Sequence, residues 1–223
     1  MSYYNTPGHF PVPAHPTSQP PVRRRGGMGT GIRHALGYIV VIWAVFFINL
    51  IFFNGDLNLW GIHPTDPASL PGILFAPFLH ANLEHLISNT IPGAVFAFFV
   101  AYSGKRVFWE VTVIAVLVAG AGTWLLGGAG TNHIGASGLL YGWLSYLVIR
   151  GIFNRSLSQT MLGLVLGFMY SGLIFGVLPG TPGVSWQGHL FGAIGGILAG
   201  MTITSDDPPA LQRKRQQQQL GRR

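Results

Sequence analysis

Six apolar runs, separated by short polar segments, constrain the fold of this 223-residue chain more than any other feature. Crossing about 30 Å of hydrocarbon takes about 20 helical residues, and only helices or closed barrels satisfy their backbone there. The chain is 49% hydrophobic and 9% charged, against about 25% charged for a soluble domain. We therefore predict an all-α membrane protein with a bundle of six transmembrane helices. The predicted spans are residues 36–53, 83–102, 107–126, 136–149, 161–178 and 186–203.

All 13 Lys and Arg residues fall on one side of this six-span topology. Because basic residues gather in cytoplasmic loops, the pattern predicts a multi-pass protein with both termini cytoplasmic, expected in the plasma membrane. The net charge of +7 does not indicate nucleic-acid binding, since the basic residues flank apolar spans. We expect the basic termini to lie near the anionic cytoplasmic leaflet. The basic residues are Arg23, Arg24, Arg25, Arg33, Lys105, Arg106, Arg150, Arg155, Arg213, Lys214, Arg215, Arg222 and Arg223.

The segments around the spans differ in composition. Residues 1–33 are rich in proline, and residues 205–223 are basic and rich in glutamine, so both are predicted to be disordered cytoplasmic tails. The membrane domain then covers residues 34–204. No cleavable signal peptide is expected, because the first basic cluster follows a long polar segment. Residues 54–82 form a long first extracytoplasmic loop, apolar enough to be folded or to rest on the bilayer.

Four polar side chains from three predicted spans lie at one depth in the outer half of the membrane. The fourth span has 14 residues and reaches only about 21 Å, so Ser137 at its outer end lies below the membrane surface. His85 and Asn89 lie one turn apart near the outer end of the second span, and His189 lies one turn into the sixth. Polar residues within a membrane are functional candidates by default.

Glycines predict that the fourth and sixth spans pack closely. Gly192 and Gly196 follow His189 on one face of the sixth span, and Gly138 follows Ser137 on the fourth. Small residues at this spacing let helix backbones approach each other. This pairing would bring His189 toward Ser137.

A serine beside a histidine can act as a nucleophile, because the histidine takes the hydroxyl proton and later protonates the leaving amine. Ser137 and His189 would form that pair. The Ser137 backbone N–H, the Asn89 amide and His85 are placed to stabilise an oxyanion. Since no acidic third member is evident, we predict a dyad in which Tyr141 packs against the imidazole of His189.

Each residue also has a structural interpretation. A serine in a membrane helix commonly bonds to its own backbone, and a single histidine or asparagine commonly holds two helices together. The motif is not the nucleophile elbow of soluble hydrolases, because Leu139 stands where that motif has glycine. The absence of cysteine excludes thiolate sites and disulfides. One alternative that stays open is a metal site formed by four histidines, namely His80, His85, His133 and His189.

Three motifs resemble those of the rhomboid family of intramembrane serine proteases, and the resemblance covers the six-span core. They are a GxSG motif with a tyrosine one turn later, two histidines and an asparagine on the second span, and a histidine with glycines on the last span. GxSG alone is a weak signal, whereas three motifs in chain order are a strong one. The matching residues are Gly135, Ala136, Ser137, Gly138 and Tyr141, then His80, His85 and Asn89, then Gly188, His189, Gly192 and Gly196.

The resemblance implies Ser137 as nucleophile and His189 as general base, in a six-helix fold without metal or cofactor. It implies that the substrates are transmembrane or membrane-anchored proteins cleaved near their outer ends. One departure is that Pro71-Gly72 occupies the place where the family often has Trp-Arg. The implied supporting residues are His85, Asn89, Gly135 and Tyr141 at the oxyanion, and His80, Gly192 and Gly196 in the surrounding structure.

Two other functions are weighed against proteolysis. A catalytically inactive relative would bind transmembrane segments, but binding requires none of Ser137, His189 and Asn89. A proton-coupled transporter would need intramembrane carboxylates or a repeated pair of broken helices, and neither is evident. The pattern leaves the substrate and the oligomeric state open.

Overall fold

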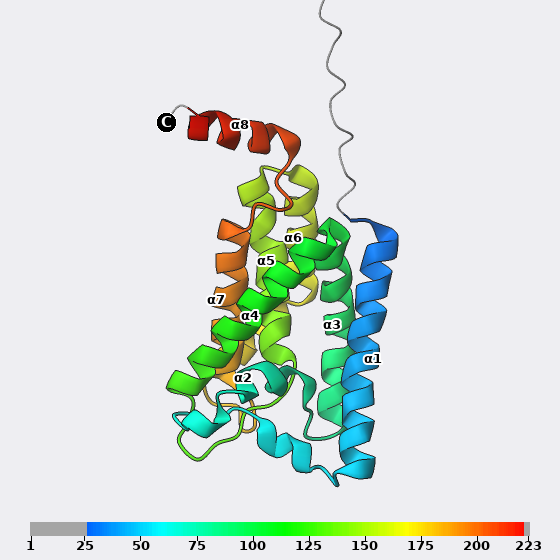
Figure 1. Ribbon diagram of the computed structural model, residues 1–223, viewed down its shortest axis with the longest axis vertical. Helices are drawn as coiled ribbons and strands as arrows, with labels where there is room; N and C mark the ends of the chain where they lie inside the picture. The colour runs from blue at the N-terminus through cyan, green and yellow to red at the C-terminus, as the bar shows by residue number, and fades with distance from the viewer. Residues whose placement is uncertain (1–25, 221–223) are drawn as a thin grey trace, which may run out of the picture.

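The computed structural model describes residues 26–220, which fold into helices joined by short loops (Figure 1). The described residues contain no strand, only an isolated antiparallel bridge between Ile62 and His133. The predicted all-α fold class is therefore confirmed. In chain order the elements are α1 (Met28–Phe52), the short 3-10 helices η1 (Asp56–Trp60) and η2 (Pro67–Ser69), α2 (Gly72–Phe75), η3 (Ala76–Phe78), α3 (Leu83–Ser103), α4 (Lys105–Leu126), α5 (Ser137–Asn154), α6 (Leu157–Met169), η4 (Ser171–Val177), α7 (Trp186–Thr202) and α8 (Pro209–Leu220).

Within residues 26–220, three helices, α1, α3 and α4, are long and apolar enough to cross a membrane. α6 and η4 together are also long and apolar enough, but they are bent by 68° relative to each other. They add a fourth span if the bent pair crosses the membrane as one broken helix. α5 and α7 are central helices, and α5 contacts α3, α4, α6 and α7. Because much of their surface never meets lipid, they need less overall hydrophobicity than α1. The count of six spans stays a prediction.

The central helix α5 is longer than its predicted span of 136–149. It begins at Ser137, close to the expected start, but continues to Asn154. One side of the added turn is buried: Arg150 is 2% exposed and bonds to Asp206 and Asp207 beyond α7. A charged group at a helix end can stay within the fold when it is fully paired, and this pairing extends α5.

Both predicted tails contain helix near the membrane domain. α1 begins at Met28, within the segment 1–33, and residues 209–220 of the segment 205–223 form α8. The two aspartates that precede α8 are held by Arg150, which gives the C-terminal segment a fixed starting point. The predicted disorder of residues 1–25 and 221–223 lies outside the described residues.

The first loop, residues 54–82, is folded, and short helices make up much of it. It is tied to the loop between α4 and α5 by the Ile62–His133 bridge. It is tied to the end of α4 by two further hydrogen bonds: the Thr65 N–H donates to the Trp124 carbonyl, and the Trp124 indole donates to the Asp66 carbonyl, both at 2.9 Å. These bonds satisfy loop backbone groups that would otherwise need water.

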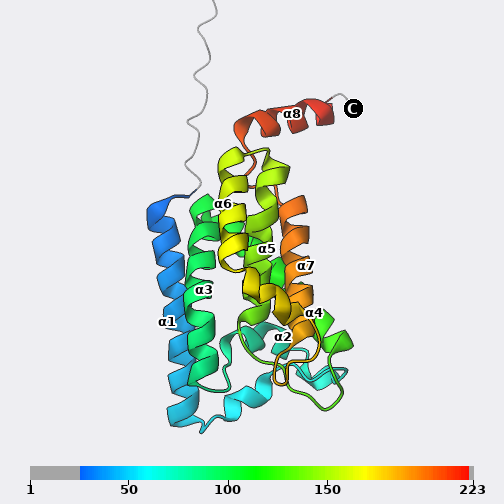
Figure 2. The same ribbon diagram turned by 180° about the vertical axis from the view of Figure 1, so that it is seen from behind.

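The bundle has two distinct ends. α8, the turn between α3 and α4 and the turn between α5 and α6 lie at one end, and the first loop lies at the other, in both side views (Figures 1 and 2). The basic residues of the described chain belong to elements at the α8 end. The arrangement agrees with the clustering of basic residues predicted from the sequence.

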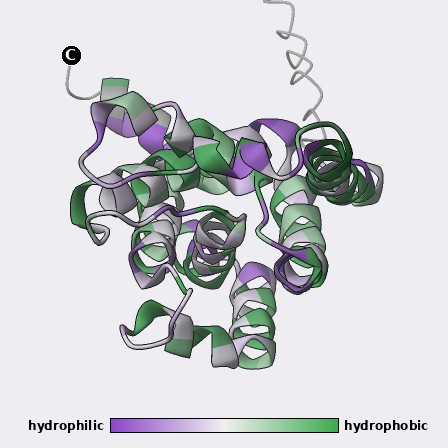
Figure 3. Ribbon diagram, turned by 90° about the horizontal axis from the view of Figure 1, so that it is seen from below, coloured by the Kyte–Doolittle hydropathy of each residue, from purple (hydrophilic) through white to green (hydrophobic). Residues whose placement is uncertain are grey.

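Hydrophobic side chains cover the sides of the bundle as well as its core. Seen along its long axis, the bundle has hydrophobic residues spread over its helices, with intermediate and hydrophilic residues among them (Figure 3). On α1, Ile51 and Phe52 are 68% and 74% exposed. Large exposed apolar surfaces are expected where a helix faces lipid. The buried core lies between α3, α4 and α5, where Phe96, Val111 and Trp143 pack.

α5 and α7 pack backbone to backbone, as their glycines predict. A Cβ atom added to Gly192 would collide with the carbonyl of Gly138, and one added to Gly196 would collide with the carbonyl of Gly142. Only glycine permits so close an approach of two helices. The predicted pairing of these two helices is confirmed, and it fixes the distance between the side chains that they carry.

Candidate active site

Ser137 is the first residue of α5 and follows a turn that requires glycine. Gly135 has φ +115°, a backbone conformation that side chains rarely adopt. Its N–H donates to the carbonyl of Ala76 at 2.8 Å, which joins the turn to the first loop. The Ser137 backbone N–H is at the helix start, where the first N–H groups have no partner within the helix. The turn therefore places the Ser137 hydroxyl and the Ser137 backbone N–H at the same end of α5.

His189 reaches Ser137 from the first turn of α7. The cap of this helix is Ser185, whose side chain accepts the Gly188 N–H at 3.3 Å and whose carbonyl accepts the His189 N–H at 3.1 Å. The imidazole is buried, and its Nε2 lies 2.7 Å from Ser137 Oγ. The structure therefore brings together the two side chains predicted as a dyad.

The second ring nitrogen of His189 decides the direction of this hydrogen bond. Nδ1 lies 2.8 Å from the carbonyl oxygen of Gly176 in η4. A carbonyl can only accept, so Nδ1 carries the proton in the neutral ring and Nε2 accepts from the Ser137 hydroxyl. Gly176 thus supplies the orienting group for which the sequence offered no carboxylate. Gly176 could not be predicted from the sequence, because any residue type can supply a backbone carbonyl.

Tyr141 stacks on the imidazole, as predicted. The Tyr141 and His189 rings lie 4.2 Å apart at 12°. The Tyr141 hydroxyl donates to the carbonyl of Leu173, also in η4. A Cβ at Gly176 would collide with this hydroxyl. The helix η4 therefore packs directly on both aromatic rings and holds them in one orientation.

His85 and Asn89 lie on α3 beside the turn before Ser137. The His85 ring touches Gly135, where an added Cβ would lie 2.5 Å from Nε2. Asn82 caps α3, and its side chain accepts the His85 N–H at 2.8 Å. Asn89 is 4% exposed and donates from its amide to the His85 carbonyl at 3.0 Å. The structure thus places His85 against the site, while Asn89 braces the turn that carries it.

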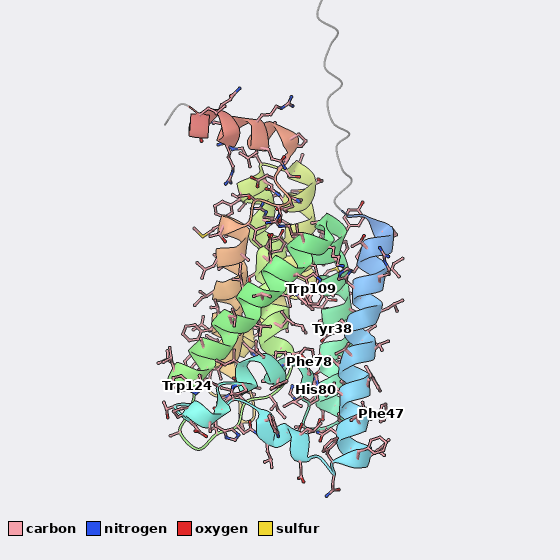
Figure 4. All side chains as sticks on the ribbon, in the orientation of Figure 1. Tyr38, Phe47, Phe78, His80, Trp109 and Trp124 are labelled. Carbon is pink, nitrogen blue, oxygen red and sulfur yellow. The ribbon has the colours of Figure 1, made fainter. Side chains whose placement is uncertain are left out.

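His80 is buried in the first loop (Figure 4) and packs against His85. The two rings are 5.0 Å apart in an edge-to-face arrangement. Neither nitrogen of His80 makes a hydrogen bond of good geometry. Burial is the main cause that lowers the pKa of His80 to about 4, with a smaller contribution from His85, and the Phe78 carbonyl opposes the shift. His80 is therefore a neutral packing group at neutral pH, consistent with the predicted structural role.

His133 joins the loop before Ser137 to the cap of α7. Its Nδ1 lies 2.8 Å from Ser185 Oγ, and its Nε2 lies 2.7 Å from Thr131 Oγ1. Burial first, and then the charge of His63, lowers the pKa of His133. The bond to Ser185 therefore ties the loop before Ser137 to the helix that carries His189.

A small cavity of about 40 Å³ lies beside Ser137. A polar cavity of this size has room for water. Its lining combines the serine, the glycines around it and hydroxyl groups from neighbouring helices, namely Thr123 and Ser185. The nucleophile therefore adjoins a space that a small polar molecule can occupy.

The four histidines considered as a metal site do not form one. Within residues 26–220, no group of three or more His, Cys, Asp or Glu side chains is placed to hold a metal ion. His80 and His85 pack ring against ring, whereas the rings of His133 and His189 bond to other partners.

Comparison with protein families gives one match, to the Rhomboid domain, over residues 67–206. That segment covers more than half of the chain and contains all the site residues discussed above. The chain belongs to the rhomboid family. It is an integral membrane protein with the helical architecture of that family.

Relatives of this rhomboid protein occur in mycobacteria. Proteins of Mycobacterium tuberculosis (strain H37Rv) and Mycobacterium bovis are each 39% identical over 212 residues, covering 91% of this chain and 87% of the relative. A protein of Mycobacterium leprae is 43% identical over 144 residues, covering 61% of this chain and 57% of the relative. All three are described as uncharacterized, so they carry no activity across to this rhomboid.

The first loop of this rhomboid departs from the family pattern in a way that its packing explains. Gly72, which stands in the place of the family's Trp-Arg pair together with Pro71, lies directly against the backbone of Gly61. Any side chain at Gly72 would collide with the Gly61 carbonyl. The loop therefore holds its shape here by backbone contact instead of through large side chains.

A buried polar cluster at the α8 end of this rhomboid was not predicted. Arg150 bonds to Asp206, Asp207 and the carbonyl of Gly200, and Tyr146 donates to Asp206 at 3.0 Å. From the sequence, Arg150 was expected in a cytoplasmic loop and both aspartates in a disordered tail. The signal that could have found the cluster is the pair of aspartates directly after the last apolar run, in a chain with six acidic residues in total.

Proposed function

We propose that this protein is an intramembrane serine endopeptidase with a Ser137–His189 dyad. The observation that carries the proposal is the 2.7 Å contact between Ser137 Oγ and His189 Nε2, on a ring whose Nδ1 is engaged by a carbonyl. Nε2 is therefore the free basic atom, and it faces the hydroxyl that it would deprotonate.

In the first step, Ser137 Oγ attacks the carbonyl carbon of the substrate peptide bond, and its proton moves to His189 Nε2. The imidazolium that forms keeps its Nδ1 proton on the Gly176 carbonyl, a favourable acceptor for a charged donor. Stacking on Tyr141 holds the ring in plane during the transfer. The carbonyl oxygen of the substrate becomes an oxyanion.

The oxyanion is stabilised by donors near the start of α5. The Ser137 backbone N–H contributes one hydrogen bond, helped by the positive end of the helix dipole. The His85 side chain, held against Gly135, contributes another from the opposite side. The Asn89 side-chain amide donates to the backbone carbonyl of His85 and so supports that residue. Asn89 is the third polar group near the oxyanion.

In the second half of the reaction, His189 gives its proton to the leaving amine, and water then hydrolyses the acyl-enzyme. His189 takes a proton from that water as it attacks, and returns it to Ser137 Oγ when the ester bond breaks. The cavity of about 40 Å³ beside Ser137 is the store from which this water comes. None of these steps needs a metal or a cofactor.

The substrates are transmembrane or membrane-anchored proteins. Ser137 starts the central helix α5, and exposed apolar side chains cover helices around it, as expected for a site that meets its substrate within the lipid. The dyad lies at the end of the bundle away from the basic residues. By the positive-inside rule this is the extracytoplasmic side, with both termini cytoplasmic and the protein in the plasma membrane.

The proposal is tested by reconstituting the purified protein in liposomes with a single-span model substrate. Wild type should cleave the substrate, Ser137→Ala should not, and Ser158→Ala, which removes an exposed hydroxyl at the α8 end, should cleave like wild type. Cleavage by Ser137→Ala at the wild-type rate would refute the dyad.

A serine-directed fluorophosphonate separates the protease from an inactive family member. Labelling of wild type at Ser137, with none in His189→Ala, is expected for an activated nucleophile. If wild type neither labels nor cleaves but still retains transmembrane peptides, the protein is an inactive binding relative.

A further inference from the structure

A large groove separates α1 from α4. α1 packs against α3, whereas α4 packs against α5 and α7, so α1 and α4 diverge. The groove encloses about 1010 Å³. Figure 4 shows Trp109, Tyr38 and Phe78 along it, between the two helices. It is separate from the cavity beside Ser137, and the wall between the two is formed by Pro77, Val116 and Leu139.

The groove is basic at one end and apolar along its length. Arg33, His34 and Lys105 line the end nearest α8. None of the described residues that line the groove is acidic. The walls are apolar, with Ile42 on α1 and Val113 on α4 among them. A ligand with an anionic head and an apolar tail matches this distribution.

The dimensions match one leaflet of a bilayer. Arg33 and Ile42 are nine residues apart on one helix, which corresponds to about 14 Å. Half of a hydrocarbon core of about 30 Å is about 15 Å. Beyond this depth the groove is lined by the first loop, through Leu74 and Phe78. A transmembrane peptide would need a passage through both leaflets, whereas an acyl chain can end inside the groove.

We propose that this groove binds one anionic phospholipid from the leaflet at the α8 end. The phosphate lies between Arg33 and Lys105, and an acyl chain lies along α1 and α4. Basic pockets between transmembrane helices on this side of a membrane favour anionic head groups. The site does not depend on the proposed protease activity, so the two proposals can fail separately.

Filling the groove tests the acyl-chain part of the site. Gly37 lines the groove, and a Cβ added there meets nothing within 4 Å, so Gly37→Leu projects into open space. Gly29→Leu is the matched control, since Gly29 is also on α1 with nothing within 4 Å of an added Cβ and does not line the groove. Native mass spectrometry with added phosphatidylglycerol should show one retained lipid for wild type and Gly29→Leu, and none for Gly37→Leu. Equal retention by both variants would overturn the proposal.

The charge requirement is tested separately with exposed residues that do not support the fold. Arg33→Gln with Lys105→Gln should weaken phosphatidylglycerol binding about twenty-five-fold, from about fivefold for each basic residue near the lipid surface. Arg213→Gln with Lys214→Gln removes the same charge from α8 and should leave binding unchanged. If phosphatidylcholine binds wild type as tightly as phosphatidylglycerol, the assignment to an anionic lipid is wrong.

The occupant is identified by cross-linking in the membrane. A photoreactive benzoylphenylalanine at Val113, which lines the groove and is 51% exposed, should gain the mass of one phospholipid in vesicles that contain phosphatidylglycerol. A cross-linked dimer would show a second copy of the chain in the groove, and a peptide adduct would show a transmembrane segment. Either of these results would replace the lipid.

Discussion

The two ends of the α5–α7 pair carry polar groups of opposite kinds. At the first-loop end, Ser137 and His189 are joined by one hydrogen bond and are neutral partners beside a small cavity. At the α8 end, Arg150 is fully buried and bonds to two aspartates and a backbone carbonyl. The same two helices therefore hold a sparse polar site at one end and a saturated ionic cluster at the other.

The difference shows how one helix pair can serve both chemistry and stability. A buried charge costs several kcal/mol unless it is paired, so the α8 end uses nearly every donor of Arg150. A nucleophile needs the reverse, a hydroxyl with one partner and space for a substrate. The glycines between the two ends let the helices pack backbone to backbone along the stretch that joins the two sites.

The largest expected effect is on activity alone, at the first-loop end. His189→Gln should lower the rate of substrate cleavage by about 10³-fold or more, because the base is lost. The free energy of unfolding, measured by thermal unfolding in detergent, should change by about 1 kcal/mol or less, since glutamine keeps one hydrogen bond. If this variant unfolded at as low a temperature as a variant of the ionic cluster, the contrast between an end for activity and an end for stability would be wrong.

The next largest effect is on stability, at the α8 end. Arg150→Met leaves two buried aspartates without their main partner and should lower the free energy of unfolding by about 3–5 kcal/mol. Arg106→Gln, which removes an exposed pair with Glu110, should cost about 1 kcal/mol or less. Both are measured by thermal unfolding in the same detergent. Equal unfolding temperatures for the two variants would show that the buried cluster contributes no more to stability than the exposed ion pair.

Beneath the active site, His80 predicts a loss of stability in acid. Its pKa is about 4 in the folded protein, against about 6.5 in an unfolded chain. The unfolded state therefore takes up a proton as the pH falls below 6.5, while the folded state does so only near pH 4. Stability is complete above pH 6.5 and declines by about 3 kcal/mol as the pH falls to 4.

The contribution of His80 is isolated by a matched variant. His80→Asn keeps a polar side chain of smaller size but has no proton to gain in this range. Unfolding temperatures measured from pH 7.5 to 4 should fall less steeply for His80→Asn than for wild type. Parallel curves would assign the acid sensitivity to the other buried histidines, and the neutral role of His80 would be wrong.

The smallest expected effect sharpens the description of the dyad. Tyr141→Phe keeps the ring on His189 and loses only the hydrogen bond to Leu173, so cleavage should fall about threefold or less. Tyr141→Leu also removes the stacked ring, which is worth about 1 kcal/mol, and should lower the rate about tenfold. If both variants have the same rate, stacking does not orient the imidazole.

The sequence by itself determined the class, the helical register and the main site residues. Apolar runs and the one-sided Lys and Arg residues predicted a membrane bundle, and glycine spacing predicted that the fourth and sixth spans pair. Ser137, His189 and Tyr141 could be named because their periodicity puts them on facing helix surfaces, and the structure does bring them together. Such inferences succeed because they depend on residue type and spacing alone.

Only the tertiary structure decided which groups complete each end of the helix pair. The Gly176 carbonyl that orients His189 is a backbone atom, and any residue in η4 could have supplied it. Arg150 meets Asp206 and Asp207 across more than 50 residues of chain, so the segment looked like a solvated tail. The groove between α1 and α4 depends on the angle between helices. Backbone partners, long-range ion pairs and the space between helices arise from packing, which residue type and local spacing do not specify.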